Sequence, residues 1–176
     1  NTLFLRFKFW RMHLSEQELI RREKLQQLVE LGIDPFPAAL FPVNTTAAYI
    51  KENYKGEENK ADFAEVCLAG RIMSIRDMGK ASFAVLQDSS DRIQIYVRRD
   101  DICPGDDKNG YDKVWKQLTD LGDIMGIKGY VFTTKTGETS VHVQELTFLT
   151  KSLKPLPVVR EADGQTFDAV TDPEFK

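Results

Sequence analysis

The stretch from residue 66 to residue 97 constrains the fold of this chain most. It reads VCLAGRIMSIRDMGKASFAVLQDSSDRIQIYV, three short β-rich runs separated by two clusters of turn-forming residues. The third run alternates, with one face formed by Ile93, Ile95 and Val97 and the other by Gln94, Tyr96 and Arg98. One face can therefore pack on a core while the other meets water or a ligand. A sheet face that is polar, aromatic and basic is typical of proteins that bind single-stranded nucleic acid.

The residues that follow complete a recognisable order of elements. After a charged loop at 100–110, the pattern predicts a helix at about 111–120, two strands and a hairpin turn at 134–137. The predicted strands are 64–76, 81–88, 91–98, 123–133 and 138–149. Three strands, a helix and two more strands is the order of an OB-fold, which binds oligonucleotides on strands 2 and 3 and on two of its loops. We therefore predict a mainly β chain with helices: a five-stranded OB-fold Greek-key barrel preceded by N-terminal helices.

The N-terminal part carries helix signals. Ser15 and Glu18 form a capping box, which predicts a helix to about Leu31, with Leu25, Leu28 and Val29 on one apolar stripe. The prolines that follow indicate a linker, and Thr45 or Thr46 caps a second, short helix that ends near Tyr54. The expected organisation is a non-native extension at 1–13, a helical segment at 14–62, the OB-fold domain at 63–151 and a linker at 152–176.

Charge and composition narrow the classes of function. The formal net charge of −3 argues weakly against nucleic acid, but residues 66–99 carry six basic side chains against three acidic ones. A locally basic surface can attract a polyanion, although these charges could equally solvate a surface. The same two interpretations stay open for Arg21, Arg22 and Lys24 on the first helix.

Several kinds of site are not indicated. No apolar run approaches the roughly 20 residues of a membrane span, so no membrane association is expected. The two cysteines fit neither a disulfide framework nor a zinc-ligand spacing, and the two histidines are isolated, so no metal site is expected. A reducing cytoplasm is the default location.

Four residues of the predicted barrel are complementary to uracil. Phe83 has a flat face on which a base could stack, and the amide of Gln94 can donate and accept at once. Arg76 can donate to a carbonyl or a phosphate, and Glu138 can accept. Uracil presents two carbonyl acceptors that flank one N–H donor, whereas cytosine would mismatch this set. The alternatives are that Phe83 fills the barrel, that Gln94 is solvated, and that Arg76 and Glu138 form a surface ion pair worth little.

Longer strings resemble a known family. CLAGRIMSIRDMGKASFAVLQD, RIQIYVRRDD and LGDIMGIKGYVFTTKTGETSVHVQELTFLTKSLKPLP are similar to the N-terminal anticodon-binding domain of bacterial-type class II lysyl-tRNA synthetases, over about residues 14–157. The resemblance implies that the chain binds the U-rich anticodon of lysine tRNA. It implies that Phe83 stacks on the central anticodon base and that Arg76, Gln94 and Glu138 contact the edge of that base. It implies weaker roles for Arg71 and Lys80 at the backbone or at neighbouring bases.

The resemblance also sets limits on this chain. The sequence ends at Lys176, before any of the motifs with which the family binds lysine, ATP and magnesium. We therefore expect no catalytic residue and no cofactor here, with ATP and magnesium belonging to a catalytic domain elsewhere in the parent ligase. The family forms homodimers largely through that domain, so dimerisation of this piece stays open. The alternatives are a freestanding OB-fold that binds single-stranded nucleic acid without sequence preference, and a barrel that binds protein.

Overall fold

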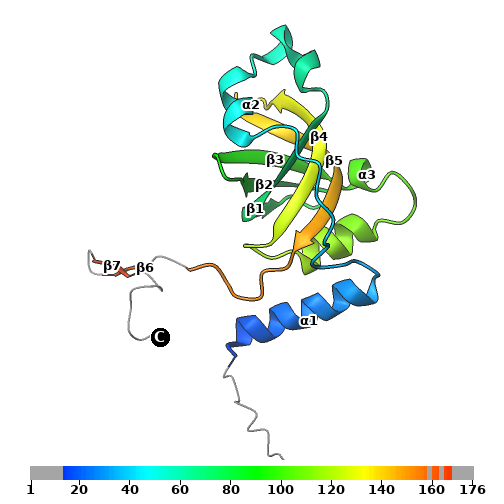
Figure 1. Ribbon diagram of the computed structural model, residues 1–176, viewed down its shortest axis with the longest axis vertical. Helices are drawn as coiled ribbons and strands as arrows, with labels where there is room; N and C mark the ends of the chain where they lie inside the picture. Colours follow the sequence, from blue (N-terminus) through cyan, green and yellow to red (C-terminus); the bar gives the residue numbers. More distant parts are fainter. Residues whose placement is uncertain (1–13, 158–159, 163–164, 168–176) are drawn as a thin grey trace, which may run out of the picture.

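A closed five-stranded barrel forms the centre of the molecule (Figure 1). The computed structural model describes residues 14–157, 160–162 and 165–167. The strands are β1 (Val66–Asp77), β2 (Ala81–Gln87), β3 (Arg92–Arg98), β4 (Ile124–Thr133) and β5 (Thr139–Thr150), and around the barrel they follow the order β1-β2-β3-β5-β4. All neighbours are antiparallel except β3 and β5, which are parallel. The predicted OB-fold barrel is confirmed.

The alternation seen in the sequence becomes the inside and outside of this barrel. Ile93, Ile95 and Val97 are at most 2% exposed, and Leu86 and Val141 are fully buried with them. The residues between them on β2 and β3 point outward and are half-buried. The outer face of β2 and β3 is thus free to carry a site while the inner face supplies the apolar burial that stabilises the barrel.

A β-bulge in β1 decides which of its side chains face outward. Ile72 pairs with Leu86, but the register then shifts so that Ser74 pairs with Val85 and Arg76 with Phe83. A regular strand would place Arg76 opposite Ser82, whose side chain is fully buried. Because a one-residue shift exchanges the two faces of a strand, the bulge turns Arg76 to the outside beside Phe83.

Helix α1 (Glu16–Glu30) lies beneath the barrel, at the end opposite to α2 (Ala47–Asn53) (Figure 1). The predicted capping box is present: the Glu18 amide donates to Ser15 Oγ at 3.3 Å, and the Ser15 amide donates to the Glu18 carboxylate at 2.9 Å. The predicted apolar stripe is wrong in part, since Leu28 is fully buried but Val29 is 57% exposed. The reason is that polar side chains, described below, make much of the contact between α1 and the rest of the chain.

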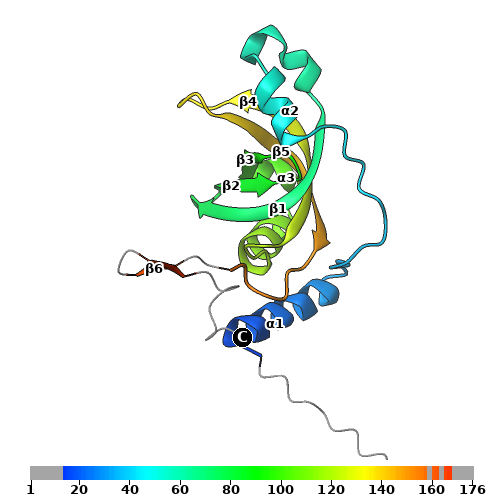
Figure 2. The ribbon, with the colours of Figure 1, turned by 60° about the vertical axis from the view of Figure 1, so that its left-hand side comes forward.

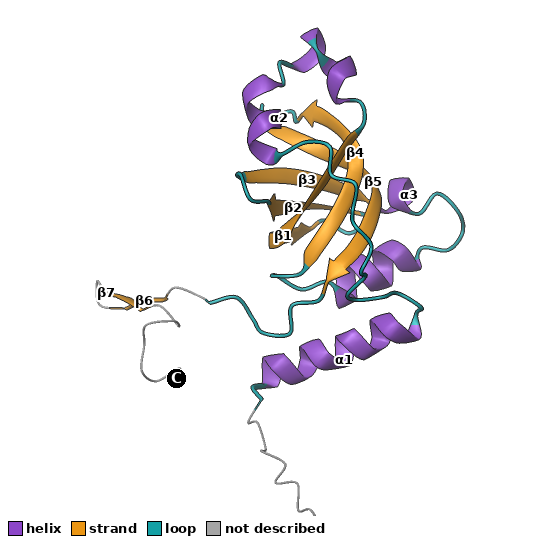
Figure 3. Ribbon diagram, viewed as in Figure 1, coloured by secondary structure: helices purple, strands orange, loops and turns teal. Residues whose placement is uncertain are grey.

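The remaining helical elements are shown in purple in Figure 3, and several of them differ from prediction. Thr46 caps α2, as one of the two predicted alternatives. After α2 the chain forms two 3₁₀ turns for which no specific signal was found in the sequence, η1 (Gly56–Glu58) and η2 (Lys60–Phe63). The predicted charged loop begins with a short helix, α3 (Arg99–Ile102), and the helix predicted at 111–120 is a π-helix, η3 (Gly110–Leu118).

The ends of the chain complete the description. Strands β6 (Arg160–Ala162) and β7 (Gln165–Phe167) pair with each other and were not predicted. The predicted extension at 1–13 and residues 158–159, 163–164 and 168–176 of the predicted linker lie outside the described residues. Of the helices that are described, none combines the length and the apolar character that crossing a bilayer requires.

Candidate nucleic-acid interface

A groove of about 770 Å³ runs over the outer face of β1, β2 and β3 and beneath the hairpin between β4 and β5. We call it the outer groove. Figure 2 shows the β4–β5 hairpin and the end of β1 projecting on the same side of the barrel, with β2 and β3 between them. Its lining includes the side chains of Ser74, Arg76, Met78, Phe83, Gln94, Tyr96 and Phe132, together with the turn residues 134–136.

Phe83 lies on the floor of the outer groove. Its neighbours Ser82 and Ala84 are at most 2% exposed and point into the barrel, whereas Phe83 is half-buried on the outer face. The interpretation that Phe83 fills the barrel is therefore wrong. Its ring centroid is 5.0 Å from that of Tyr96, which pairs with it across β2 and β3. The pair forms an aromatic surface on which a flat ligand can stack.

Gln94 is held in one orientation by Ser140. Its Nε2 donates to Ser140 Oγ at 2.8 Å, and Ser140 is fully buried. The Ser140 hydroxyl donates in turn to the Glu138 carbonyl at 3.4 Å, so its oxygen is free to accept from Gln94. Gln94 is thus half-buried and oriented, not loosely solvated, and its Oε1 remains available as an acceptor toward the groove.

Arg76 and Glu138 lie on the two sides of the outer groove. Arg76 is exposed, and its guanidinium contacts the Met78 sulfur at 3.9 Å. Glu138 is exposed at the start of β5, where its backbone closes the hairpin through two bonds of 2.9 and 3.0 Å to Thr134. Its carboxylate is not part of the groove lining. The ion pairs found among residues 14–157 do not join Arg76 to Glu138, so the ion-pair interpretation is wrong for the described chain.

The two weaker candidates lie apart from these four. Arg71 lies in the middle of β1, where its Nη1 donates to the Gly122 carbonyl at 2.7 Å, and it is not part of the groove lining. Lys80 is exposed in the turn after β1, close to the groove in sequence but outside its lining. The structure therefore brings Arg76, Phe83 and Gln94 together, places Glu138 and Lys80 at neighbouring turns, and separates Arg71 from them.

Sequence reasoning missed an aromatic cluster that continues the floor of the groove. The rings of Tyr96, Phe132 and His142 contact one another at centroid distances of 5.1–6.2 Å, and Tyr130 stacks on His142 at 4.8 Å. The His142 ring is fixed on both sides, by Asp101 at 2.6 Å and by the Tyr130 hydroxyl at 3.0 Å. The spacing of Tyr130 and Phe132, two residues apart on a strand, was the signal in the sequence that could have revealed them.

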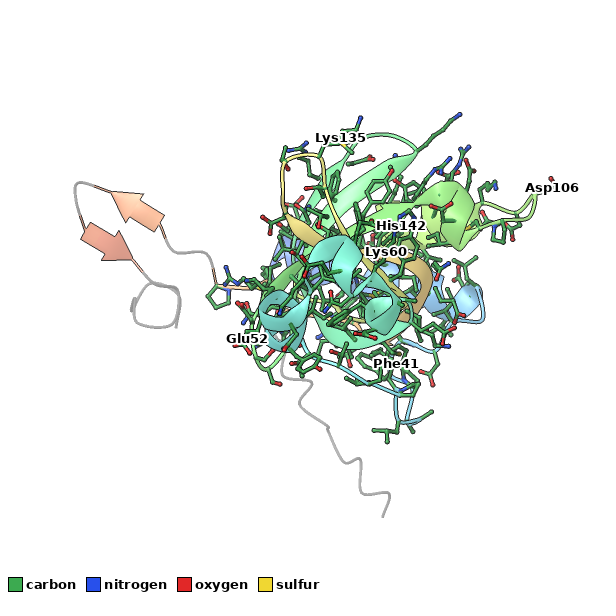
Figure 4. The ribbon with its side chains drawn as sticks, turned by 90° about the horizontal axis from the view of Figure 1, so that it is seen from above. Phe41, Glu52, Lys60, Asp106, Lys135 and His142 are labelled. Carbon is green, nitrogen blue, oxygen red and sulfur yellow. The ribbon has the colours of Figure 1, made fainter. Side chains whose placement is uncertain are left out.

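The basic residues of α1 serve the fold. Arg21 is 6% exposed, and its guanidinium donates to the carbonyls of Leu121 and Ser152 at 2.9 Å each. Lys24 Nζ lies 2.6 Å from Asp120. The interpretation as a solvated helix face is therefore wrong for these two side chains, because both are engaged in contacts within the fold. Another basic side chain, that of Lys135, is exposed in the β4–β5 hairpin and lines the outer groove; Figure 4 shows Lys135 at the outer end of this hairpin.

A metal site is not found among the described residues. Within them, no group of three or more histidine, cysteine, aspartate or glutamate side chains could hold a metal ion. Cys67 and Cys103 are both buried and unbonded, and burial raises the pKa of the Cys67 thiol. The arrangement is suited to binding a flat, polar ligand through stacking and hydrogen bonds.

Comparison with known proteins agrees with this geometry. A family model named for the tRNA anticodon, and described as an OB-fold nucleic acid binding domain, matches residues 66–149. That range begins with β1 and ends one residue before the end of β5.

Individual relatives carry the likeness beyond the barrel. A lysine–tRNA ligase of Porphyromonas gingivalis is 60% identical over 163 residues, which are 93% of this chain and 28% of the relative. The lysine–tRNA ligase of Azobacteroides pseudotrichonymphae is 48% identical over 163 residues, 93% of this chain and 32% of that protein. The lysine–tRNA ligase of Christiangramia forsetii is 48% identical over 168 residues, which are 95% of this chain and 28% of that protein. The chain thus spans less than a third of the length of these curated relatives.

Proposed function

We propose that the outer groove binds the U-rich anticodon of lysine tRNA, because the barrel matches the model of an OB-fold nucleic acid binding domain and the chain is similar to the N-terminal part of lysine–tRNA ligases. One observation carries the proposal: an aromatic floor, an oriented amide and a guanidinium meet in one groove at Phe83, Gln94 and Arg76. Stacking alone would accept any base, because every base has a π-face. The Gln94 amide and the Arg76 guanidinium add the capacity to select one base over another.

The polar groups of the groove match uracil. Because Gln94 Nε2 is engaged by Ser140, its Oε1 is presented as an acceptor for the single ring N–H of uracil. The Arg76 guanidinium supplies donors for a uracil carbonyl, and the base stacks on Phe83. Cytosine has no N–H at the corresponding ring position and carries an amino group instead of one carbonyl. It would therefore leave Gln94 without a partner and bring two donors together, which costs affinity.

The neighbouring turns extend this contact. Glu138 and Lys80 are exposed on opposite sides of the groove, so we assign Glu138 to the edge of an anticodon base and Lys80 to the RNA backbone. Arg71, which the resemblance suggested as a weaker contact, donates to the Gly122 carbonyl from the middle of β1. We assign it to the fold and not to the RNA.

The parent protein follows from its relatives. We propose that it is a cytoplasmic lysine–tRNA ligase that joins lysine to tRNA with ATP and magnesium, and that it acts as a homodimer. We assign the ATP and magnesium sites to the part of the ligase that this chain does not span, since the chain covers 28% of the length of its Porphyromonas gingivalis relative. We also propose that the chain divides into a helical segment at 14–62, the barrel at 63–151 and a linker at 152–176. In this proposal the linker connects the barrel to the catalytic part of the ligase.

Binding of two RNA hairpins tests the proposal. We expect an anticodon stem-loop with UUU to bind much more tightly than an otherwise identical one with CCC, measured by fluorescence anisotropy at one fixed salt concentration. Phe83→Ala and Gln94→Ala should each weaken UUU binding by about 1–3 kcal/mol, through lost stacking and lost edge contacts respectively.

Two matched variants control for general effects of truncation. Phe36→Ala removes an aromatic ring that is 47% exposed in the linker, and Gln26→Ala removes an exposed amide on α1; both should bind UUU as the wild type does. Equal affinity for UUU and CCC would instead favour a barrel that binds single strands without preference. Failure to bind either hairpin, with no effect of salt, would favour a protein-binding barrel.

A further inference from the structure

The π-helix η3 packs against the turn between β1 and β2. Tyr111 is fully buried, and its hydroxyl lies 2.8 Å from Ser82 Oγ while donating to the Gly79 carbonyl at 3.2 Å. Because the Tyr111 hydroxyl donates to the Gly79 carbonyl, it accepts the hydrogen bond from the Ser82 hydroxyl. Both hydroxyl groups therefore have hydrogen-bond partners. Tyr111 thus joins η3 both to the turn and to the first residues of β2.

Lys116 makes a second connection to the same turn. Its Nζ lies 2.8 Å from Asp77 Oδ2 and 3.4 Å from the Gly79 carbonyl. The other oxygen of Asp77 accepts the Gly79 amide at 2.8 Å. The hydrogen bond from Lys116 holds the pKa of Asp77 below its usual range, and the same bond raises the pKa of Lys116. The pair is therefore ionised at neutral pH, and it ties the turn to the helix.

The π-winding explains why two residues five apart in sequence reach one turn. In an α-helix, with 3.6 residues per turn, residues 111 and 116 would point about 140° apart. A π-helix bonds residue i to residue i+5, which brings such residues to nearly the same side. The bond from the Thr119 amide to the Val114 carbonyl, at 3.0 Å, shows this spacing at the end of η3.

The turn held in this way supplies one wall of the outer groove. Arg76 directly precedes Asp77, and Met78 lies inside the turn; both line the groove. The Arg76 guanidinium contacts the Met78 sulfur, so its position depends on the backbone of the turn. Phe83 and Gln94, in contrast, are placed by the paired strands β2 and β3.

From these contacts we propose that Tyr111 and Lys116 are positioning residues that determine base selectivity by holding Arg76 at the groove. The inference rests on the proposed binding of the anticodon. Neither side chain lines the groove. When either connection is lost, the turn can move and the Arg76 donors leave the carbonyl they would contact. Stacking on Phe83 remains, so discrimination between bases falls while general affinity for RNA persists.

Selectivity measured in two variants tests the inference. Lys116→Met and Tyr111→Phe, made in the full chain, are compared with wild type for binding of the UUU and CCC stem-loops by anisotropy. We expect the UUU-to-CCC affinity ratio to fall about fivefold or more in each, as expected for one lost hydrogen bond, with CCC affinity within about twofold of wild type. Lys116→Arg, which keeps the cation, should retain the ratio.

Lys128→Met is the matched control. It removes a lysine whose ion pair with Glu145, at 2.9 Å, is also partly exposed but lies outside the groove. It should leave the ratio unchanged.

A double-mutant cycle separates positioning from a general loss of stability. In an Arg76→Met background, adding Lys116→Met should change the ratio no further, because the group it positions is gone. A further fall of similar size would overturn the inference, as would an unchanged ratio in both single variants of a wild type that discriminates. A wild type that binds both hairpins equally would overturn the proposed function itself.

Discussion

The orientation of one amide depends on a buried serine that sequence reasoning did not single out. Ser140 is fully buried on β5, pairs with Gln94 across β3 and β5, and accepts its Nε2 at 2.8 Å. Without this acceptor the Gln94 amide could turn and present a donor to the groove in place of its oxygen. Since uracil and cytosine differ in that donor–acceptor pattern, we expect Ser140 to affect the proposed selectivity without touching the base.

Ser140→Ala tests this dependence. A net hydrogen bond is worth about 0.5–1.5 kcal/mol, so we expect UUU binding to weaken about two- to tenfold while CCC binding changes little. Isothermal titration calorimetry with both stem-loops measures the two constants. Ser89→Ala, at an exposed position in the β2–β3 turn, serves as the control and should bind as wild type does. An equal loss for both hairpins would contradict the orienting role.

Among the elements, β4 and β5 approach so closely at one point that only glycine fits. The register of this pair shifts between Lys128 and Gly129. A Cβ atom built on Gly129 would overlap the backbone carbonyl of His142. Because the obstacle is backbone and not a flexible side chain, the strands themselves would have to separate. This crossing holds the base of the hairpin that carries Phe132 and Glu138.

Gly129→Ala should therefore destabilise the barrel by about 1–3 kcal/mol or more, as overpacking against a fixed neighbour does. The measurement is the free energy of unfolding from urea denaturation. Gly105→Ala is the control: a Cβ there meets nothing within 4 Å, and we expect a change within about 0.5 kcal/mol. A Gly129 variant as stable as the control would show that β4 and β5 can separate at little cost.

At the scale of the whole molecule, a buried cluster of charges joins the barrel to α1 and to the residues that follow β5. Lys151 is 2% exposed, and its Nζ lies 2.6 Å from Asp120 and 2.8 Å from Asp123. Asp120 also contacts Lys24 of α1 at 2.6 Å. Burial acts to raise the pKa of Asp120, but hydrogen bonds from Lys151 and Lys24 outweigh it and lower that pKa below its usual range.

Lys151→Met should remove about 3–5 kcal/mol of stability at pH 7, because it leaves the fully buried Asp123 carboxylate without its cation and removes one of the two lysines that contact Asp120. Urea denaturation measures the loss, and Lys154→Met, at an exposed position, should show almost none. The lowered pKa of Asp120 means that its contribution is complete above the ordinary aspartate pKa of about 4 and is lost as the pH falls through the folded value. The gap between wild type and variant should therefore narrow below about pH 4. A gap that is constant with pH would argue against a charge effect.

The sequence by itself determined the features that depend on residues close together in the chain. Alternation in 92–98 predicted the inner and outer faces of β3, and the spacing of Ser15 and Glu18 predicted the start of α1. The order of the predicted strands and helix was enough to predict the barrel. The residue types at 76, 83 and 94 were enough to propose that the site binds a nucleic-acid base. Periodicity and capping act over a few residues, so they can be read from the chain alone.

Only the tertiary structure decided which groups face one another. The orientation of Gln94 by Ser140 and the burial of Arg21 arise from contacts between segments far apart in sequence, and the bulge that turns Arg76 outward arises from the pairing of β1 with β2. The aromatic cluster of Tyr96, Phe132 and His142 arises in the same way. A one-residue shift of register reverses the faces of a strand at no change in composition, so these placements depend on closing the barrel and cannot be derived from local pattern.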